Sequence, residues 1–249
     1  DGAAACVGRE SPPSHVCAKN RDRGMQPEPA NRSDGDGLRA SAEPVECGIT
    51  DVVVDFCAVL IDWRPRRALE GLYPSGVLDM FFDPDDEWGF DYYDAMSDCG
   101  WSEERVIADY GRHHGPAVTW LMRLYFDRRR LALKGMIPGM GEMLESLHGQ
   151  GIRLWGLTNF TRFYVDAARD MFPALRMLDG VMLSDEEHLS KPDRALFLRA
   201  SHRFGLQGDH TLFIDDQQRN VDSALAAGWH AIRFEGASRL RKALAAPGG

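Results

Sequence analysis

Short apolar runs alternate with segments of helical periodicity over most of the second half of the chain. This pattern predicts strands over residues 51–56, 152–157, 181–183, 212–214 and 230–234. It predicts helices over residues 141–148, 162–171, 194–204 and 220–227. Several glycines stand where these helices would end, at positions 149, 151, 205, 208 and 228. Repeated strand–helix units indicate an α/β fold, with a mostly parallel sheet covered by helices on both faces.

Residues 64–135 interrupt this alternation. They contain many aromatic residues with charged residues between them, and their apolar positions do not alternate as in a β-strand. The aromatic residues are Trp88, Tyr92, Tyr93, Trp101, Tyr110, Trp120 and Tyr125. We therefore expect a helical insertion after the first strand, which leaves residues 49–63 and 136–249 as the core. The insertion could act as a lid over a site, or its aromatic residues could simply form a small core of their own. The basic run at 128–130 is expected on one solvated helix face.

Residues 1–48 are rich in Pro, Ser, Gly, Asn, Asp and Arg and contain almost no large apolar residue. They show no hydrophobic period, so the sequence predicts a disordered tail. The chain begins with Asp1, and Met25 lies inside this tail. Residues 1–24 could therefore lie outside the natural protein.

Charge and composition restrict the partners and the location. The net charge of −9 argues against nucleic-acid or membrane-surface binding, which needs a basic face. No apolar stretch reaches the ~20 residues of a membrane span, and the N-terminus has no apolar core of a signal peptide. The five cysteines form no CxxC pair, which fits a reducing compartment. We expect a cytoplasmic protein, and its oligomeric state stays open.

Two of the apolar runs end in carboxylates. Asp55 follows residues 52–54, and Asp215 with Asp216 follows residues 211–214. Buried carboxylates are costly to leave unpaired, and the carboxyl ends of parallel strands are where ligands bind in open α/β sheets. We expect the three carboxylates to meet at one site and hold a cation.

Four segments extend this pattern, each after a predicted strand or at the start of a helix. They are Asp55-Phe56-Cys57-Ala58-Val59-Leu60, Leu157-Thr158-Asn159, Ser190-Lys191-Pro192-Asp193, and Phe213-Ile214-Asp215-Asp216 followed by Asn220. In this order they resemble the haloacid dehalogenase-like hydrolase superfamily, over residues 50 to about 240. The insertion is similar to that of the branch with an α-helical cap between the first two motifs. The resemblance implies a Rossmann-like core, a cap over residues 64–135, and activity like that of the small-metabolite phosphatases.

The resemblance also implies a role for each residue. Asp55 would be the nucleophile that attacks phosphorus and forms an aspartyl-phosphate. Mg²⁺ would take oxygen ligands from three side chains and one backbone carbonyl: Asp55, Asp215, Asp216 and the carbonyl of Cys57. Lys191 and the hydroxyl of Thr158 would bind the phosphoryl oxygens and stabilise the transition state. Asn159 would help to bind the substrate, and Asn220 would support the metal ligands.

Each of these residues also has a simpler interpretation. Asp215 or Asp216 could cap the following helix, which is a common role for Asp at a strand-to-helix junction. Lys191 alone could be an ordinary loop lysine, and Thr158 with Asn159 could form a cap. Only the ordered combination of all four segments favours a catalytic site.

Cys57 departs from the pattern of the phosphatases. Most of them carry a second Asp two residues after the nucleophile, which protonates the leaving oxygen and later activates water. General acid–base catalysis typically contributes 10²–10⁴-fold, and a thiol with a pKa near 8.5 replaces it poorly. Turnover would then need a group that departs easily, or a proton from water or from the helical insertion.

Three functions remain open from the sequence. The first is a Mg²⁺-dependent hydrolase that removes phosphate from a small phosphorylated metabolite. The second is a 2-haloacid dehalogenase, which also lacks the second Asp. The third is a catalytically weak member that binds a phosphorylated ligand or a protein partner. The retained pair Asp215 and Asp216 favours phosphoryl chemistry, because adjacent buried acids without a cation would be destabilising.

Overall fold

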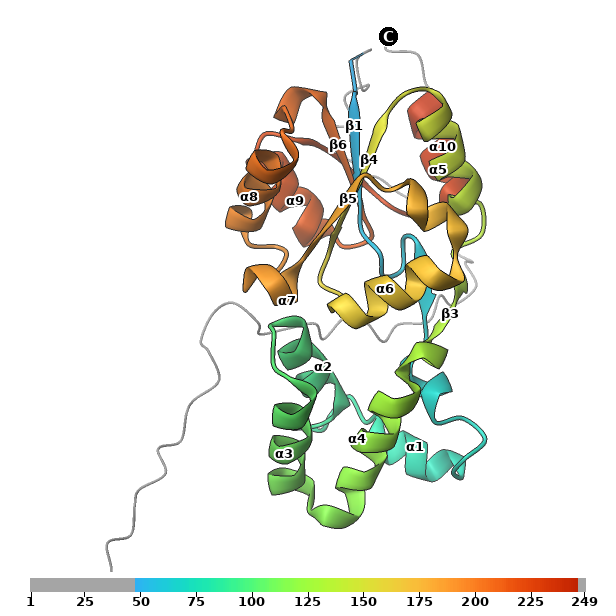
Figure 1. The fold of residues 1–249 in the computed structure, drawn as a ribbon, viewed down its shortest axis with the longest axis vertical. Coiled ribbons are helices and arrows are strands. Elements are labelled where there is room, and N and C mark those ends of the chain that lie inside the picture. The colour runs from blue at the N-terminus through green and yellow to red at the C-terminus, as the bar shows by residue number, and fades with distance from the viewer. Residues whose placement is uncertain (1–47, 246–249) are drawn as a thin grey trace, which may run out of the picture.

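The computed structural model describes residues 48–245 (Figure 1). The disordered tail expected over residues 1–48 lies outside the described residues, apart from Gly48, as do residues 246–249. Within the described range, no helix is both long and apolar enough to cross a membrane.

Five parallel strands form the central sheet in the order β5-β4-β1-β6-β7. Their bounds are β1 (Asp51–Val54), β4 (Arg153–Thr158), β5 (Gly180–Leu183), β6 (Thr211–Asp215) and β7 (His230–Arg233). β1 lies in the middle, where Val54 is in register with Gly156 of β4 and Ile214 of β6. The first and last motifs therefore reach the same edge of the sheet.

Helices cover both faces of the sheet, as Figure 1 shows. Alternate residues of a strand point to opposite faces, so Val52 and Val54 pack with one helical layer and Val53 with the other. The first layer contains α5 (Met140–Gly149), α6 (Arg162–Met171) and α10 (Ala237–Ala245). The second contains α8 (Arg194–Phe204) and α9 (Gln218–Ala226). The α/β fold with a mostly parallel sheet is confirmed.

Between β1 and β4, helices form a separate unit below the sheet in Figure 1. This helical unit consists of η1 (Pro65–Ala68), α1 (Ser75–Phe81), α2 (Phe90–Asp98), α3 (Glu103–His114) and α4 (Pro116–Arg128). It has its own apolar cluster, in which Phe81, Phe90, Tyr93, Tyr110 and Tyr125 are at most 3% exposed. Many of its aromatic residues therefore do form a core of their own.

A short antiparallel pair connects the helical unit to the sheet domain. Its strands are β2 (Ile61–Trp63) and β3 (Leu133–Met136), with Ile61 opposite Met136 and Trp63 opposite Leu133. The sequence pattern missed this pair and assigned residues 133–135 to the helical stretch, because strands of three and four residues show too little periodicity. It also missed the 3-10 turns η2 (Arg129–Ala132), η3 (Pro173–Met177) and η4 (Gly208–His210), the single-turn helix α7 (Ser184–Glu187), and α10.

The helical unit also touches the sheet domain at α7. The Ser184 hydroxyl, 1% exposed, donates to the carbonyl of Asp98 at 2.6 Å and lies 3.2 Å from the carbonyl of Asn159. Gly100, two residues after Asp98, has a φ of +90°, and a Cβ atom there would lie 3.0 Å from the carbonyl oxygen of Asp185. Glycine therefore permits the close approach of the two parts at this point.

We expect Ser184→Ala to loosen this contact. The substitution leaves the carbonyl of Asp98 without its hydroxyl donor, which costs about 1 kcal/mol of stability. Amide hydrogen exchange measured by mass spectrometry should become faster at the C-terminal end of α2, while exchange in β1 and β6 stays unchanged. Ser146→Ala, on the exposed face of α5, is the matched control. Unchanged exchange in α2 would contradict a stabilising role for the Ser184 hydroxyl.

Candidate active site

The turn after β1 fixes the position of Asp55. The amide of Asp55 donates to the carbonyl of Ile214 at 3.0 Å, and the amide of Phe56 donates to Asp55 Oδ1 at 2.7 Å. The chain then turns back, so that the amide of Ile61 donates to the Phe56 carbonyl at 2.8 Å. Gly156 admits the ring of Phe56, because a Cβ atom there would lie 2.7 Å from Phe56 Cε2. Asp55 is thereby held at the centre of the sheet edge.

Lys191 joins the first and last motifs. Its Nζ lies 2.7 Å from Asp55 Oδ1 and 2.7 Å from Asp215 Oδ2. Lys191 and Asp55 are each 5% exposed, and Asp215 is fully buried. One carboxylate oxygen from each of Asp55, Asp215 and Asp216 lies within 4.8 Å of the others. The structure thus brings together four of the residues selected from the sequence.

Asn220 and Asn159 hold this cluster in place. Asn220 Nδ2 donates to both carboxylate oxygens of Asp215, at 2.9 and 3.0 Å. The Asn159 side chain makes two hydrogen bonds to the backbone of Lys191. Its Oδ1 accepts from the Lys191 amide at 3.0 Å, and its Nδ2 donates to the Lys191 carbonyl at 3.3 Å. Both asparagines therefore orient charged residues of the cluster.

Asp215 and Thr158 make local turn contacts but do not cap the following helices, whose N-cap residues are Gln217 for α9 and Thr161 for α6. Asp215 Oδ1 accepts from the amide of Gln217 at 2.9 Å, just before α9. Thr158 Oγ1 accepts from the amide of Phe160 at 3.0 Å, and Thr158 is fully buried at the end of β4. Cys57 lies two residues after Asp55 and is partly buried. Asp215 and Thr158 can therefore stabilise local turns and still lie at the edge of the sheet where the cluster forms.

Burial dominates the electrostatics of the cluster. It raises the pKa of Asp55 from 3.8 to about 7, against the lowering effect of Lys191 and with further increases from Asp215 and Asp216. Burial would lower the pKa of Lys191, but the neighbouring Asp215 and Asp55 outweigh it and raise that pKa. With all groups ionised, the cluster has two negative charges in excess. One divalent cation would balance them, and carboxylate oxygens are the ligands that Mg²⁺ prefers.

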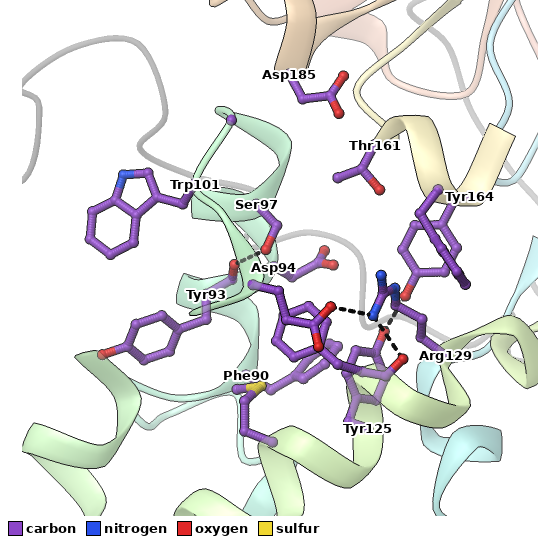
Figure 2. A pocket seen from close by; sticks show the side chains of 15 residues that line it. Phe90, Tyr93, Asp94, Ser97, Trp101, Tyr125, Arg129, Thr161, Tyr164 and Asp185 are labelled. Atoms are coloured by element: carbon purple, nitrogen blue, oxygen red, sulfur yellow. Dashed lines mark hydrogen bonds and ion pairs between the residues drawn. The ribbon is translucent and has the colours of Figure 1, made fainter. Parts of the chain in front are cut away.

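A cavity of about 290 Å³ lies between the helical unit and the sheet domain. Figure 2 shows Tyr93, Asp94 and Ser97 of α2 on one side, with Thr161 and Asp185 of the sheet domain across from them. Sequence reasoning missed this cavity, because its walls come from separate parts of the chain and no local motif marks them.

Arg129 also belongs to the cavity wall. Its side chain is 17% exposed, and its Nη1 donates to Glu103 Oε2 at 2.9 Å. The expectation that residues 128–130 form a solvated helix face is therefore wrong for Arg129. The chain leaves the α-helix at this residue and enters η2, so the helical periodicity no longer applies there.

The family model for haloacid dehalogenase-like hydrolases matches residues 104–234 of this chain. The chain belongs to this family. The matched range includes Thr158, Lys191, Asp215 and Asp216, and it begins after Asp55.

Curated relatives include several phosphatases. The chain is 32% identical to Protein CbbY of Rhodobacter capsulatus over 177 residues, 67% of this chain and 76% of that protein. It is 30% identical to the phosphoglycolate phosphatase of Nitrosospira multiformis over 109 residues, 44% and 45% of the two chains. It is 28% identical to the chloroplast flavin mononucleotide hydrolase 1 of Arabidopsis thaliana over 130 residues, 48% and 53% of the two chains. The latter two alignments span about half of each relative's length.

Solved structures share the fold. A HAD-like family hydrolase from Porphyromonas gingivalis superimposes with a TM-score of 0.62 at 22% identity, covering 80% of this chain and all of that one. A HAD family enzyme from Bacteroides thetaiotaomicron, in complex with magnesium and inorganic phosphate, gives 0.61 at 17% identity, covering 76% and 96%. The L-2-haloacid dehalogenase of Xanthobacter autotrophicus gives 0.53 at 17% identity, covering 75% and 77%.

The pKa of Asp55 leads to a prediction about metal and pH. An acid whose pKa rises from 3.8 to about 7 on folding binds its proton more tightly in the folded state. It therefore lowers stability progressively as the pH rises through that window. Mg²⁺ would compete with that proton, so added MgCl₂ should raise Tm by several degrees at pH 8 and by less at pH 5.

Differential scanning fluorimetry measures both shifts, with NaCl at equal ionic strength as the control. The variant Asp216→Asn should lose most of the shift at pH 8. An equal response at both pH values, or none, would argue against a cation at these carboxylates.

Proposed function

We propose that the protein is a Mg²⁺-dependent hydrolase that removes phosphate from a small phosphorylated metabolite through an aspartyl-phosphate. One observation carries the proposal: Lys191 lies between Asp55 and Asp215 at 2.7 Å from each, and Asp216 adds a third carboxylate. A carboxylate attacks a phosphate only where the negative charge of both is neutralised. This cluster offers a fixed ammonium group and oxygen ligands for a cation at the same place.

In this mechanism, Asp55 attacks phosphorus and the ester oxygen leaves with the bonding electron pair. Lys191 and the hydroxyl of Thr158 bind the phosphoryl oxygens and stabilise the charge that develops there. The leaving alkoxide takes a proton from water, because Cys57 stands where a carboxylic acid would donate it. A second water then attacks the aspartyl-phosphate and gives a proton to the hydroxide left by the first, which releases inorganic phosphate and restores Asp55. The products are one alcohol and one phosphate for each water consumed.

Three carboxylates and one carbonyl would hold the Mg²⁺: Asp55, Asp215, Asp216 and the backbone of Cys57. When bound, the ion would supply positive charge to the phosphate and to Asp55. Asn220 keeps the carboxylate of Asp215 oriented for this task, since it binds both of its oxygens. The helical unit would act as a cap that covers the substrate.

The phosphoglycolate phosphatase and the flavin mononucleotide hydrolase among the relatives support this assignment. The magnesium and phosphate complex from Bacteroides thetaiotaomicron and the solved haloacid dehalogenase are each 17% identical to this chain, so they support the fold alone. A curated (S)-2-haloacid dehalogenase 4A of Burkholderia cepacia also matches, at 24% identity over 137 residues. The acidic pair Asp215 and Asp216 also favours phosphoryl transfer, because attack on a carbon–halogen bond does not need a cation site. A phosphorylated metabolite is therefore the substrate class that we propose.

Asp55→Asn tests the nucleophile. The substitution keeps the volume of the side chain but removes the attacking carboxylate, so hydrolysis of p-nitrophenyl phosphate should fall on the order of 10⁴-fold. Tm should change little, because burial of a neutral amide is less costly than burial of a charge. Asp222→Asn, at an exposed position on α9, is the control. Activity near that of the parent in Asp55→Asn would rule out the covalent mechanism.

Cys57→Asp tests how much the absence of a carboxylic acid at position 57 slows hydrolysis. A carboxylic acid at position 57 could protonate the leaving oxygen, so hydrolysis of alkyl phosphates should become faster by about 10²-fold. Hydrolysis of p-nitrophenyl phosphate should change little, since p-nitrophenolate leaves readily as an anion.

A plot of log kcat/KM against the pKa of the leaving alcohol measures this difference. Its slope should be steep for the parent and shallow for Cys57→Asp. A shallow slope in the parent would mean that Cys57 does not limit the reaction. Cys57→Ser, which adds no acid of suitable pKa, serves as the matched control.

A further inference from the structure

We propose that the cavity between the helical unit and the sheet domain selects a cationic organic group, so that the substrate is a phosphomonoester carrying an ammonium group. This inference rests on the proposed function, whose substrate class it narrows. It predicts discrimination against phosphates that carry a carboxylate.

The wall of the cavity is aromatic. Seven of its fifteen lining residues are Phe, Tyr or Trp, and Figure 2 shows Tyr125 and Tyr164 close to each other beside Arg129. The hydroxyls of Tyr125 and Tyr164 bond to each other, which leaves their rings as the main surface offered to a ligand. Aromatic faces attract cations and most strongly where water is excluded. One such contact already exists in the wall, because the Arg129 guanidinium lies 3.8 Å from the ring centroid of Phe163.

The charges of the wall are predominantly negative. Among the described residues, the cavity is lined by three acids, Asp94, Glu103 and Asp185, and by one basic residue, Arg129. Glu103 binds Arg129 at 2.9 Å and so neutralises it. The carboxylate of Asp185, on α7, faces this space across from α2 (Figure 2). An ammonium group in this space would be attracted to this carboxylate, whereas a second anionic group would be repelled.

Asp185 offers a specific acceptor. Its Oδ2 accepts from the amide of Arg162 at 2.9 Å, while its Oδ1 is buried and has no hydrogen-bond partner. A buried carboxylate oxygen without a donor is costly, and burial raises the pKa of this carboxyl. A ligand that brings an N–H group or a positive charge would remove that cost.

The cavity is close to Thr158, which is proposed to bind the phosphate. Thr161 in its wall is three residues after Thr158, at most about 11 Å along the backbone. Asp185 follows Ser184, whose hydroxyl lies 3.2 Å from the carbonyl of Asn159. A single small metabolite could therefore place its phosphate at Asp55 and its organic part in the cavity.

Binding of an isosteric pair tests the cavity directly. Choline and 3,3-dimethylbutan-1-ol have nearly the same shape and differ in one positive charge. Isothermal titration calorimetry on the full chain with MgCl₂ should show choline binding at least about tenfold more tightly than the alcohol. Asp185→Asn should reduce that ratio about threefold or more, because it removes the negative charge that attracts choline. The Asn side chain can still accept from the amide of Arg162, so the local structure should be kept. Asp170→Asn, outside the cavity and 70% exposed, should leave the ratio unchanged.

Turnover of matched phosphates tests selection during catalysis. Phosphocholine should give a kcat/KM at least about tenfold above that of phosphoglycolate, with 3,3-dimethylbutyl phosphate between them. The preference should fall in Asp185→Asn mainly through a higher KM for phosphocholine. Glu103→Gln releases Arg129, so phosphoglycolate turnover should rise about tenfold. Glu104→Gln, the exposed neighbour, should have no such effect.

The outcomes separate the two proposals. Hydrolysis of p-nitrophenyl phosphate together with equal turnover of the three phosphates would overturn the cavity proposal and leave the proposed function intact. Absence of all phosphatase activity together with selective choline binding would overturn the proposed function and leave a cation-binding cavity. Equal binding of choline and the alcohol, or no binding of choline, overturns the cavity proposal in either case.

Discussion

The burial of two carboxylates and one ammonium group at a single edge of the sheet, with a third carboxylate partly buried beside them, is the constraint on which the site depends. Asp55 and Asp215 follow neighbouring strands, and Lys191 enters from the loop after α7 to lie between them. Each charge would be unfavourable in this environment without the others. The strand order, the two asparagines and the tight turn after Asp55 all preserve this arrangement, so fold and chemistry impose the same demands on the chain.

Much of this could be predicted from the sequence, for a physical reason. Strands such as 52–54 and 211–215 are buried on both faces, so they form continuous apolar runs, and a carboxylate directly after such a run stands out. The short strands β2 and β3 have no such signal. The cavity is a larger omission, because Asp94, Arg129 and Asp185 come from three distant segments and become neighbours only through tertiary packing.

Arg129 illustrates this limit. Three consecutive arginines suggest exposure. Arg130 is exposed, whereas Arg128, the last residue of α4, is partly buried. The change from α-helix to η2 turns Arg129 toward Glu103 and Phe163. Composition gives the charge of this residue, but only the end of the helix determines whether that charge faces solvent or a ligand cavity.

The short segment from Asp55 to β2 couples metal binding to movement of the helical unit. Residue 57, whose carbonyl is the proposed backbone ligand, pairs with Ile61, and Ile61 begins the strand that carries the helical unit. Movement of that unit about β2 and β3 would therefore change the position of a metal ligand. Linkage requires the effect to be reciprocal. A substrate that holds the helical unit closed would tighten metal binding by the same factor by which the metal tightens substrate binding.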